Sequence, residues 1–96
     1  MNAHIGLPEH FNGTLAQDDV GTISPSANGN IISVLVKNTD STHLLDVNFD
    51  GSDNWFRLDT TDRSISISCD IPSFRIKAIN GDCDYQIVLT REPNVR

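Results

Sequence analysis

The chain has 96 residues, the size of one small domain with a thin core. Thirteen acidic residues against seven basic ones give a formal net charge of −6, which opposes binding to the phosphates of nucleic acid. No apolar run approaches the length of a membrane-spanning helix, and the first residues lack the basic and apolar regions of a signal peptide. We therefore expect neither nucleic acid nor a membrane as a partner.

The first third of the chain is weakly periodic and rich in turn-forming residues. Turn pairs interrupt it at Asn12-Gly13, Val20-Gly21, Ser24-Pro25 and Asn28-Gly29. Because Gly and Pro are unfavourable inside helices, a long helix is excluded there, and only short strands near 13–16 or 20–24 are expected. The sequence therefore predicts an irregular N-terminal arm at 1–30, extended or partly paired, followed by a domain at 31–96.

From residue 31 onward, apolar and polar residues alternate with the period of a β-strand. Six such segments are found, at 32–37, 45–50, 56–58, 64–69, 74–78 and 85–90. Turn signals separate them, the strongest being Asp50-Gly51 and Asn80-Gly81. Short strands that recur in this way are typical of an all-β fold, here an antiparallel β-sandwich of about six to eight strands.

One face of each predicted strand supplies the core. The expected inward residues are Ile32, Val34, Val36, Leu45, Val47, Phe49, Phe56, Leu58, Ile65, Ile67, Phe74, Ile76, Tyr85, Ile87 and Leu89. Their polar neighbours, among them Asp46, Asn48 and Asp50, are expected to face solvent. Burying these apolar faces requires a second layer, which two stacked sheets provide.

A possible calcium motif begins at Asp46. The residues Asp46-Val47-Asn48-Phe49-Asp50-Gly51 match the opening of a calcium loop, D-x-[DN]-x-[DN]-G. The twelfth position, which needs an acid, is Arg57, and no helix pattern follows. Strand alternation explains the same residues, so no metal or cofactor is assigned. A looser turn site that uses Asp50, Asp53 and Asp59 stays open.

No grouping of residues suggests catalysis. The histidines His4, His10 and His43 have no partner at metal-binding spacing. The serines of the segment 64–68 lack a nucleophile elbow, and phosphate-binding glycine motifs are missing. We therefore expect a protein that is not an enzyme.

The two cysteines, Cys69 and Cys83, do not form a disulfide framework or a zinc motif. They are interpreted as reduced thiols, although pairing across two strands stays open.

Contact with a partner is expected at two places. Trp55 is exposed if Phe56 points inward, and it lies beside Asp53 and Asn54 in the predicted hairpin. The alternative, in which Trp55 caps the core edge, is left open. The second place is the arm, through its apolar residues Leu7, Phe11 and Leu15.

Several segments together resemble a known group of proteins. They are Val34-Leu35-Val36-Lys37-Asn38-Thr39, Val47-Asn48-Phe49-Asp50-Gly51-Ser52 with Trp55-Phe56-Arg57-Leu58, and Phe74-Arg75-Ile76-Lys77-Ala78 leading to Tyr85-Gln86-Ile87-Val88. Their order resembles small β-sandwich virion proteins of tailed bacteriophages, namely capsid decoration (cement) proteins and related head or tail accessory proteins. The resemblance covers roughly residues 31–90 and does not include the first 30.

The resemblance implies a non-enzymatic structural role in the virion. Many copies, assembled in the host cytoplasm, would bind the major coat protein or other virion proteins, bridge coat subunits and stabilise the shell. Self-association into a homo-oligomer is also implied. The place within the virion, whether capsid, neck, tail or fibre, stays open. The alternative function is a carbohydrate- or ligand-binding sandwich that uses Trp55 and turn carboxylates, with or without calcium.

Overall fold

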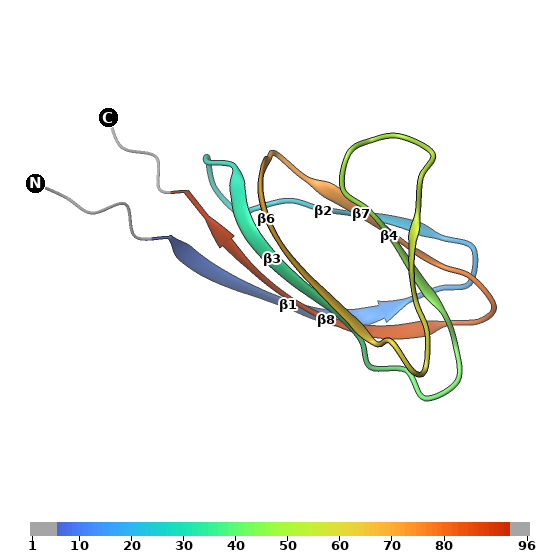
Figure 1. Ribbon diagram of the computed structural model, residues 1–96. Helices are drawn as coiled ribbons and strands as arrows, with labels where there is room; N and C mark the ends of the chain where they lie inside the picture. Colours follow the sequence, from blue (N-terminus) through green and yellow to red (C-terminus); the bar gives the residue numbers. More distant parts are fainter. Residues whose placement is uncertain (1–5, 93–96) are drawn as a thin grey trace, which may run out of the picture.

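The computed structural model describes residues 6–92, which form eight strands in two antiparallel sheets packed face to face (Figure 1). The first sheet, called the long sheet here, has the order β1 (Leu7–Leu15), β8 (Cys83–Arg91), β3 (Ile31–Asn38) and β6 (Ser64–Ile71). The second, the short sheet, has the order β2 (Val20–Ile23), β7 (Phe74–Ala78), β4 (Leu45–Asn48) and β5 (Phe56–Leu58). The predicted all-β antiparallel sandwich is confirmed.

The order of the strands defines the topology. Every connection crosses from one sheet to the other except the β4–β5 hairpin, so strands adjacent in a sheet come from distant parts of the chain. Eight strands arranged in this way form a jelly roll, in which two Greek keys close around one core. Within the described part of the chain, no helix is long and apolar enough to cross a membrane.

All six strands predicted after residue 30 are present, as β3 to β8. Their alternation places apolar side chains between the sheets, as the burial along β7 illustrates, where Phe74, Ile76 and Ala78 are buried. The turn predicted at Asp50-Gly51 is also confirmed, because Gly51 adopts a φ of 76°, which favours glycine.

The expected arm is not separate from the sandwich over residues 7–23. Leu7–Leu15 pairs with β8 along nine residues, and Val20–Ile23 pairs with β7. The strand near residue 20 was expected, but the long first strand was not. Pro8 and Gly13 weaken its strand pattern, whereas a complete hydrogen-bonding partner in β8 stabilises it. Residues 1–5 lie outside the described residues.

The core contains 13 buried apolar residues. They are Ile23, Ile31, Val34, Val36, Leu45, Val47, Leu58, Phe74, Ile76, Ala78, Cys83, Ile87 and Leu89. Of the other predicted inward residues, Phe49, Ile65, Ile67 and Tyr85 are half-buried and pack against this cluster.

Two predictions of inward residues are wrong. Ile32 is only half-buried and lies beside Thr90, while its neighbour Ile31 is fully buried. A register shift between Ile31 and Ser33 exchanges their faces. Phe56 is 50% exposed, because β5 is a three-residue edge strand.

A buried amide joins four parts of the fold. Asn38, at the end of β3, is fully buried, and its Nδ2 donates to the carbonyl oxygens of His43 (2.8 Å) and Leu58 (3.1 Å). Its Oδ1 accepts from the backbone N–H of Asp40 (2.9 Å) and from the Cys83 thiol (3.3 Å). Since buried polar groups must be paired, this one side chain holds the 39–44 connection against β5 and β8.

We expect Asn38→Ala to lower the free energy of unfolding by about 2–4 kcal/mol, because it leaves two buried carbonyls unpaired and a cavity behind. Urea unfolding with an unchanged m-value measures this change. The matched control is Asn12→Ala on the exposed face of β1, which should change stability by less than about 0.5 kcal/mol. Equal effects of the two substitutions would contradict the role of Asn38.

Candidate functional site

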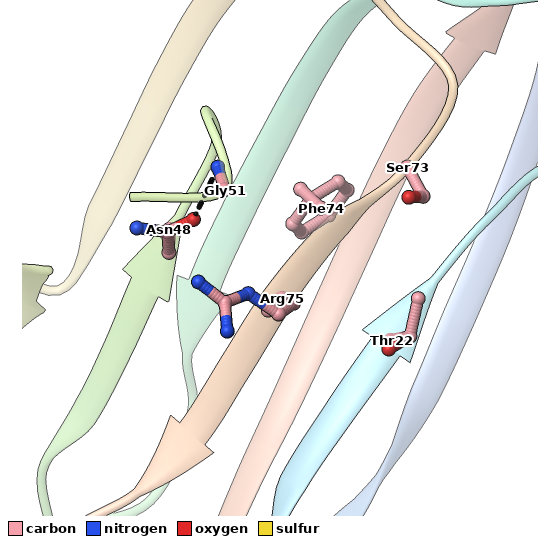
Figure 2. Close-up of a pocket in the computed structure, with 6 residues that line it drawn as sticks. All are labelled: Thr22, Asn48, Gly51, Ser73, Phe74 and Arg75. Atoms are coloured by element: carbon pink, nitrogen blue, oxygen red, sulfur yellow. Dashed lines mark hydrogen bonds between the residues drawn. The ribbon is translucent and has the colours of Figure 1, made fainter. Parts of the chain in front are cut away.

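The connection between β4 and β5 is organised by Asn48. This side chain is buried, and its Nδ2 donates to the carbonyl oxygens of Ser52 (2.8 Å) and Asn54 (2.7 Å). Its Oδ1 accepts from the backbone N–H of Gly51 (2.8 Å), the bond drawn in Figure 2. One amide therefore satisfies three backbone groups of the loop and holds its shape.

Asp50 closes the same turn. Its Oδ1 accepts from the backbone N–H of Ser52 (3.0 Å) and from the Ser52 hydroxyl (2.6 Å). These bonds to Ser52 favour the ionised form and lower the pKa of Asp50.

Asp46 and Asn48, which match the calcium motif in the sequence, bind other groups of the protein. Asp46 is only 7% exposed, and its two carboxylate oxygens accept from Arg57 Nε (2.8 Å) and Nη2 (3.1 Å). This hydrogen bonding and the carboxylate charge raise the pKa of Arg57. The prediction that Asp46 and Asn48 face solvent is wrong, because Arg57 from β5 covers Asp46 and the loop covers Asn48. Their oxygens thus bind protein groups.

Trp55 lies beneath a cation. The guanidinium carbon of Arg75 lies 4.9 Å from the centre of the Trp55 ring, and Arg75 Nη2 donates to the Ser52 carbonyl (2.8 Å). Trp55 itself is half-buried. Asp53 and Asn54 form the exposed tip of the same loop.

Two small hollows flank this loop at one end of the sandwich. The first, of about 210 Å³, is lined by Thr22, Asn48, Gly51, Ser73, Phe74 and Arg75. In Figure 2, Arg75 extends from β7 toward Asn48, while Thr22 and Ser73 lie on the other side. The second, of about 270 Å³, lies between the 49–51 turn and residues 71–73. Both are smaller than most small-molecule sites.

The outer faces of the two sheets differ in charge. Side chains that alternate with the core residues of the short sheet include three cations, Arg57, Arg75 and Lys77, and one anion, Asp46. The outer face of the long sheet, over four longer strands, includes only Lys37, Asp70 and Asp84 as charged groups. The remaining acids of this acidic chain lie mainly in connections, so the long sheet presents a nearly neutral surface.

The predicted contact residues do not form one site. Leu7 is exposed at the start of β1, but Phe11 and Leu15 on the same strand pack against the core. Trp55, Asp53 and Asn54 lie together in the β4–β5 loop, on the other sheet. The sequence did not predict Arg75 or Leu35 as contact residues, because the half-buried position of Arg75 and the exposed position of Leu35 depend on which strands become neighbours.

Both cysteines are free thiols. Cys83 is fully buried on the inner face of β8, and burial raises the pKa of its thiol to about 11. It is therefore protonated near neutral pH. Cys69 is half-buried on β6, and burial also raises its thiol pKa.

The fold is shared with known structures, although the chain matches no family model and no curated protein sequence. The Cupin_2 domain of an XRE family transcriptional regulator from Enterobacter cloacae has a TM-score of 0.60 at 18% identity, covering 91% of this chain and 83% of that one. The Yersinia pseudotuberculosis-derived mitogen has a TM-score of 0.58 at 15% identity, covering 96% and 92%. At these identities the likeness shows the fold alone, a jelly-roll β-sandwich.

We expect Arg75→Ala to uncover Trp55, the one tryptophan of the chain. Acrylamide should quench the fluorescence of the variant more strongly, and the free energy of unfolding should fall by about 0.5–1 kcal/mol. Lys77→Ala, on the same face of β7, is the control and should leave quenching unchanged. Equal quenching in Arg75→Ala and the native chain would show that Arg75 does not cover the ring.

Acidic pH is expected to lower the free energy of unfolding through the carboxylates of the connections. The pKa of Asp40 is lowered, chiefly by the backbone N–H of Thr42, and that of Asp59 by those of Asp62 and Thr61. A lowered folded-state pKa means that the unfolded chain binds more protons, so stability is complete above the unfolded pKa near about 4 and falls as pH drops below it. Urea midpoints between pH 7 and pH 3 measure the loss.

Asp40→Asn should reduce this acid dependence without abolishing it, because one of the acids with a lowered pKa is gone while Asp59 remains. Asp53→Asn removes the same charge from the exposed loop tip and should keep the native slope. An unchanged midpoint down to pH 3 in the native chain would contradict the expectation.

Proposed function

We propose that this chain is a non-enzymatic structural protein of a bacteriophage virion, which binds coat protein and bridges neighbouring coat subunits as a decoration protein does. The observation that carries the proposal is the nearly neutral outer face of the long sheet, here called the docking face. Its centre is Leu35, which lies opposite Val88 on β8 and Ser66 on β6.

The docking face has the composition of an interface centre. Leu35 is 40% exposed, and Val88 beside it is half-buried. Polar side chains surround them, including Ser64, Ser66 and Gln86, and Lys37 is the charged side chain beside Leu35 on this face. Charged residues are depleted in the centres of protein interfaces because their desolvation is costly. A chain of net charge −6 that keeps one broad face almost free of charge is therefore suited to bind protein there.

Two further arguments support the proposal. The jelly roll is an architecture of viral capsid domains and of lectins, so the fold is compatible with a particle protein. The sequence resemblance to small virion proteins covers β3 to β8, which include two of the four strands of the docking face in full and most of β8. Because one fold serves many functions, the docking face and not the fold carries the argument.

The carbohydrate-binding alternative has weaker support. A sugar stacks on an open aromatic ring, whereas Arg75 lies over one face of Trp55. The hollow beside it, of about 210 Å³, is small for a sugar ring with its hydroxyl groups.

The test is the copy number of the chain on purified phage particles assembled with each variant. The native chain should be present in a fixed ratio to coat protein. Leu35→Glu should lower its copy number by about tenfold or more, because a charge is then buried against the partner. Circular dichroism and the urea midpoint verify that the variant is folded.

Val20→Glu is the matched control, since Val20 is 48% exposed on the outer face of the short sheet. It should leave the copy number unchanged. A native chain that is missing from particles would overturn the virion role, and a Leu35→Glu variant that binds fully would overturn the docking face.

A further inference from the structure

The strand β6 is an edge strand without the usual protection. Within residues 6–92, it pairs as a strand with β3 alone. Exposed edges recruit other strands unless they are short, charged or interrupted by proline. The edge strands β2 and β5 have only four and three residues, and β1 contains Pro8. In contrast, β6 has eight residues, no proline, and no charge from Ser64 to Cys69.

The backbone of β6 directs hydrogen-bonding groups toward the open side. The carbonyl of Arg63 accepts from the Asn38 N–H (2.7 Å), so residue 63 faces β3. Directions alternate along the regular part of an antiparallel strand, which turns the N–H and C=O groups of Ser64, Ser66 and Ser68 away from β3. These three residues form a row of donors and acceptors that fits another strand.

The side chains of β6 also favour an added strand. Ile65, Ile67, Cys69 and Ile71 face the interior but are only half-buried, because no strand lies beyond them in the described part of the sheet. The serines on the opposite face are exposed. A new strand with apolar residues on the inner face and small polar residues on the outer face would continue both surfaces.

We propose that the occupant is β6 of a second copy of this chain, paired antiparallel about a two-fold axis. The two long sheets then form one continuous sheet of eight strands. A two-fold contact requires a patch that complements itself, and β6 meets this requirement because its central residues are uncharged. Two copies of net charge −6 repel each other over most of their surfaces but meet here without like charges.

The register follows from the sequence of β6. The register that keeps Asp70 in the outermost pair places Ile67 opposite its own copy, which sets Ser66 opposite Ser68, Ile65 opposite Cys69 and Ser64 opposite Asp70. Apolar residues then face apolar residues, Ser66 faces Ser68, and each Asp70 faces Ser64 at one end of the contact. The pairing concerns free copies of the chain, so it goes beyond the proposed function and does not depend on particle binding.

Light scattering and sedimentation of the full chain over a wide concentration range test the dimer. The native chain should shift reversibly from monomer to dimer. Ser66→Pro removes a free-edge N–H and, on the open side of an edge strand, preserves the bond pattern with β3. Ser66→Pro should raise the dissociation constant of the dimer by about tenfold or more. Ser66→Thr is the matched control and should leave this dissociation constant unchanged.

Disulfide formation tests the register. In a Cys69→Ser background, Ile67→Cys should oxidise rapidly to a covalent dimer. The two facing Cα atoms of such a pair lie about 4.5 Å apart, within the roughly 4.4–6.8 Å that a disulfide spans. Leu35→Cys in the same background is the control, because residue 35 is exposed on the neighbouring strand and its oxidation reports random collisions. Its rate of covalent dimer formation should be lower by about tenfold or more.

A chain that stays monomeric at every concentration would overturn the pairing. So would a Ser66→Pro variant that dimerises like the native chain, or equal oxidation of the two cysteine variants. Copy number on particles is a separate measurement, so a monomer that still binds particles would refute this dimer and leave the proposed function intact.

Discussion

The structure depends on one constraint, which is that each sheet has an apolar face that only the other sheet can cover. The 13 buried residues come from six of the eight strands, so no smaller part of the chain encloses a core of this kind. The need to cover these apolar faces also explains why β1 forms a long strand despite Pro8 and Gly13. Its pairing with β8 brings Phe11 and Leu15 onto the core, which stabilises a segment whose local pattern is weak.

The interior of the sandwich is packed with apolar side chains. Polar groups have structural roles in the connections at the ends of the sandwich. Asn38 and Asn48 each satisfy several backbone groups of a connection, and Asp40, Asp50 and Asp59 accept backbone N–H groups in tight turns. The lowered pKa values of these acids follow from those bonds. The negative charge of the chain is thus concentrated in its connections.

This distribution leaves the long sheet with two surfaces suited to protein contact. Its outer face is nearly neutral around Leu35, and its β6 edge is uncharged and unprotected. The two surfaces are adjacent, since Ser66 lies on β6 directly opposite Leu35. A dimer joined at β6 would carry two outer faces side by side, and binding by both at once would strengthen a weak contact with a repetitive surface such as a shell.

The sequence by itself determined the strands β3 to β8, the β-sandwich class and the loop at Asp50-Gly51, because alternation and turn preferences depend on neighbouring residues. Tertiary structure decided the rest. The nine-residue pairing of β1, the bulge that buries Ile31 in place of Ile32, and the burial of Asp46 by Arg57 all require partners distant in the chain. Trp55 was a predicted contact residue, but Arg75 above it was not. Strand order selects such neighbours, and local periodicity carries no information about that order.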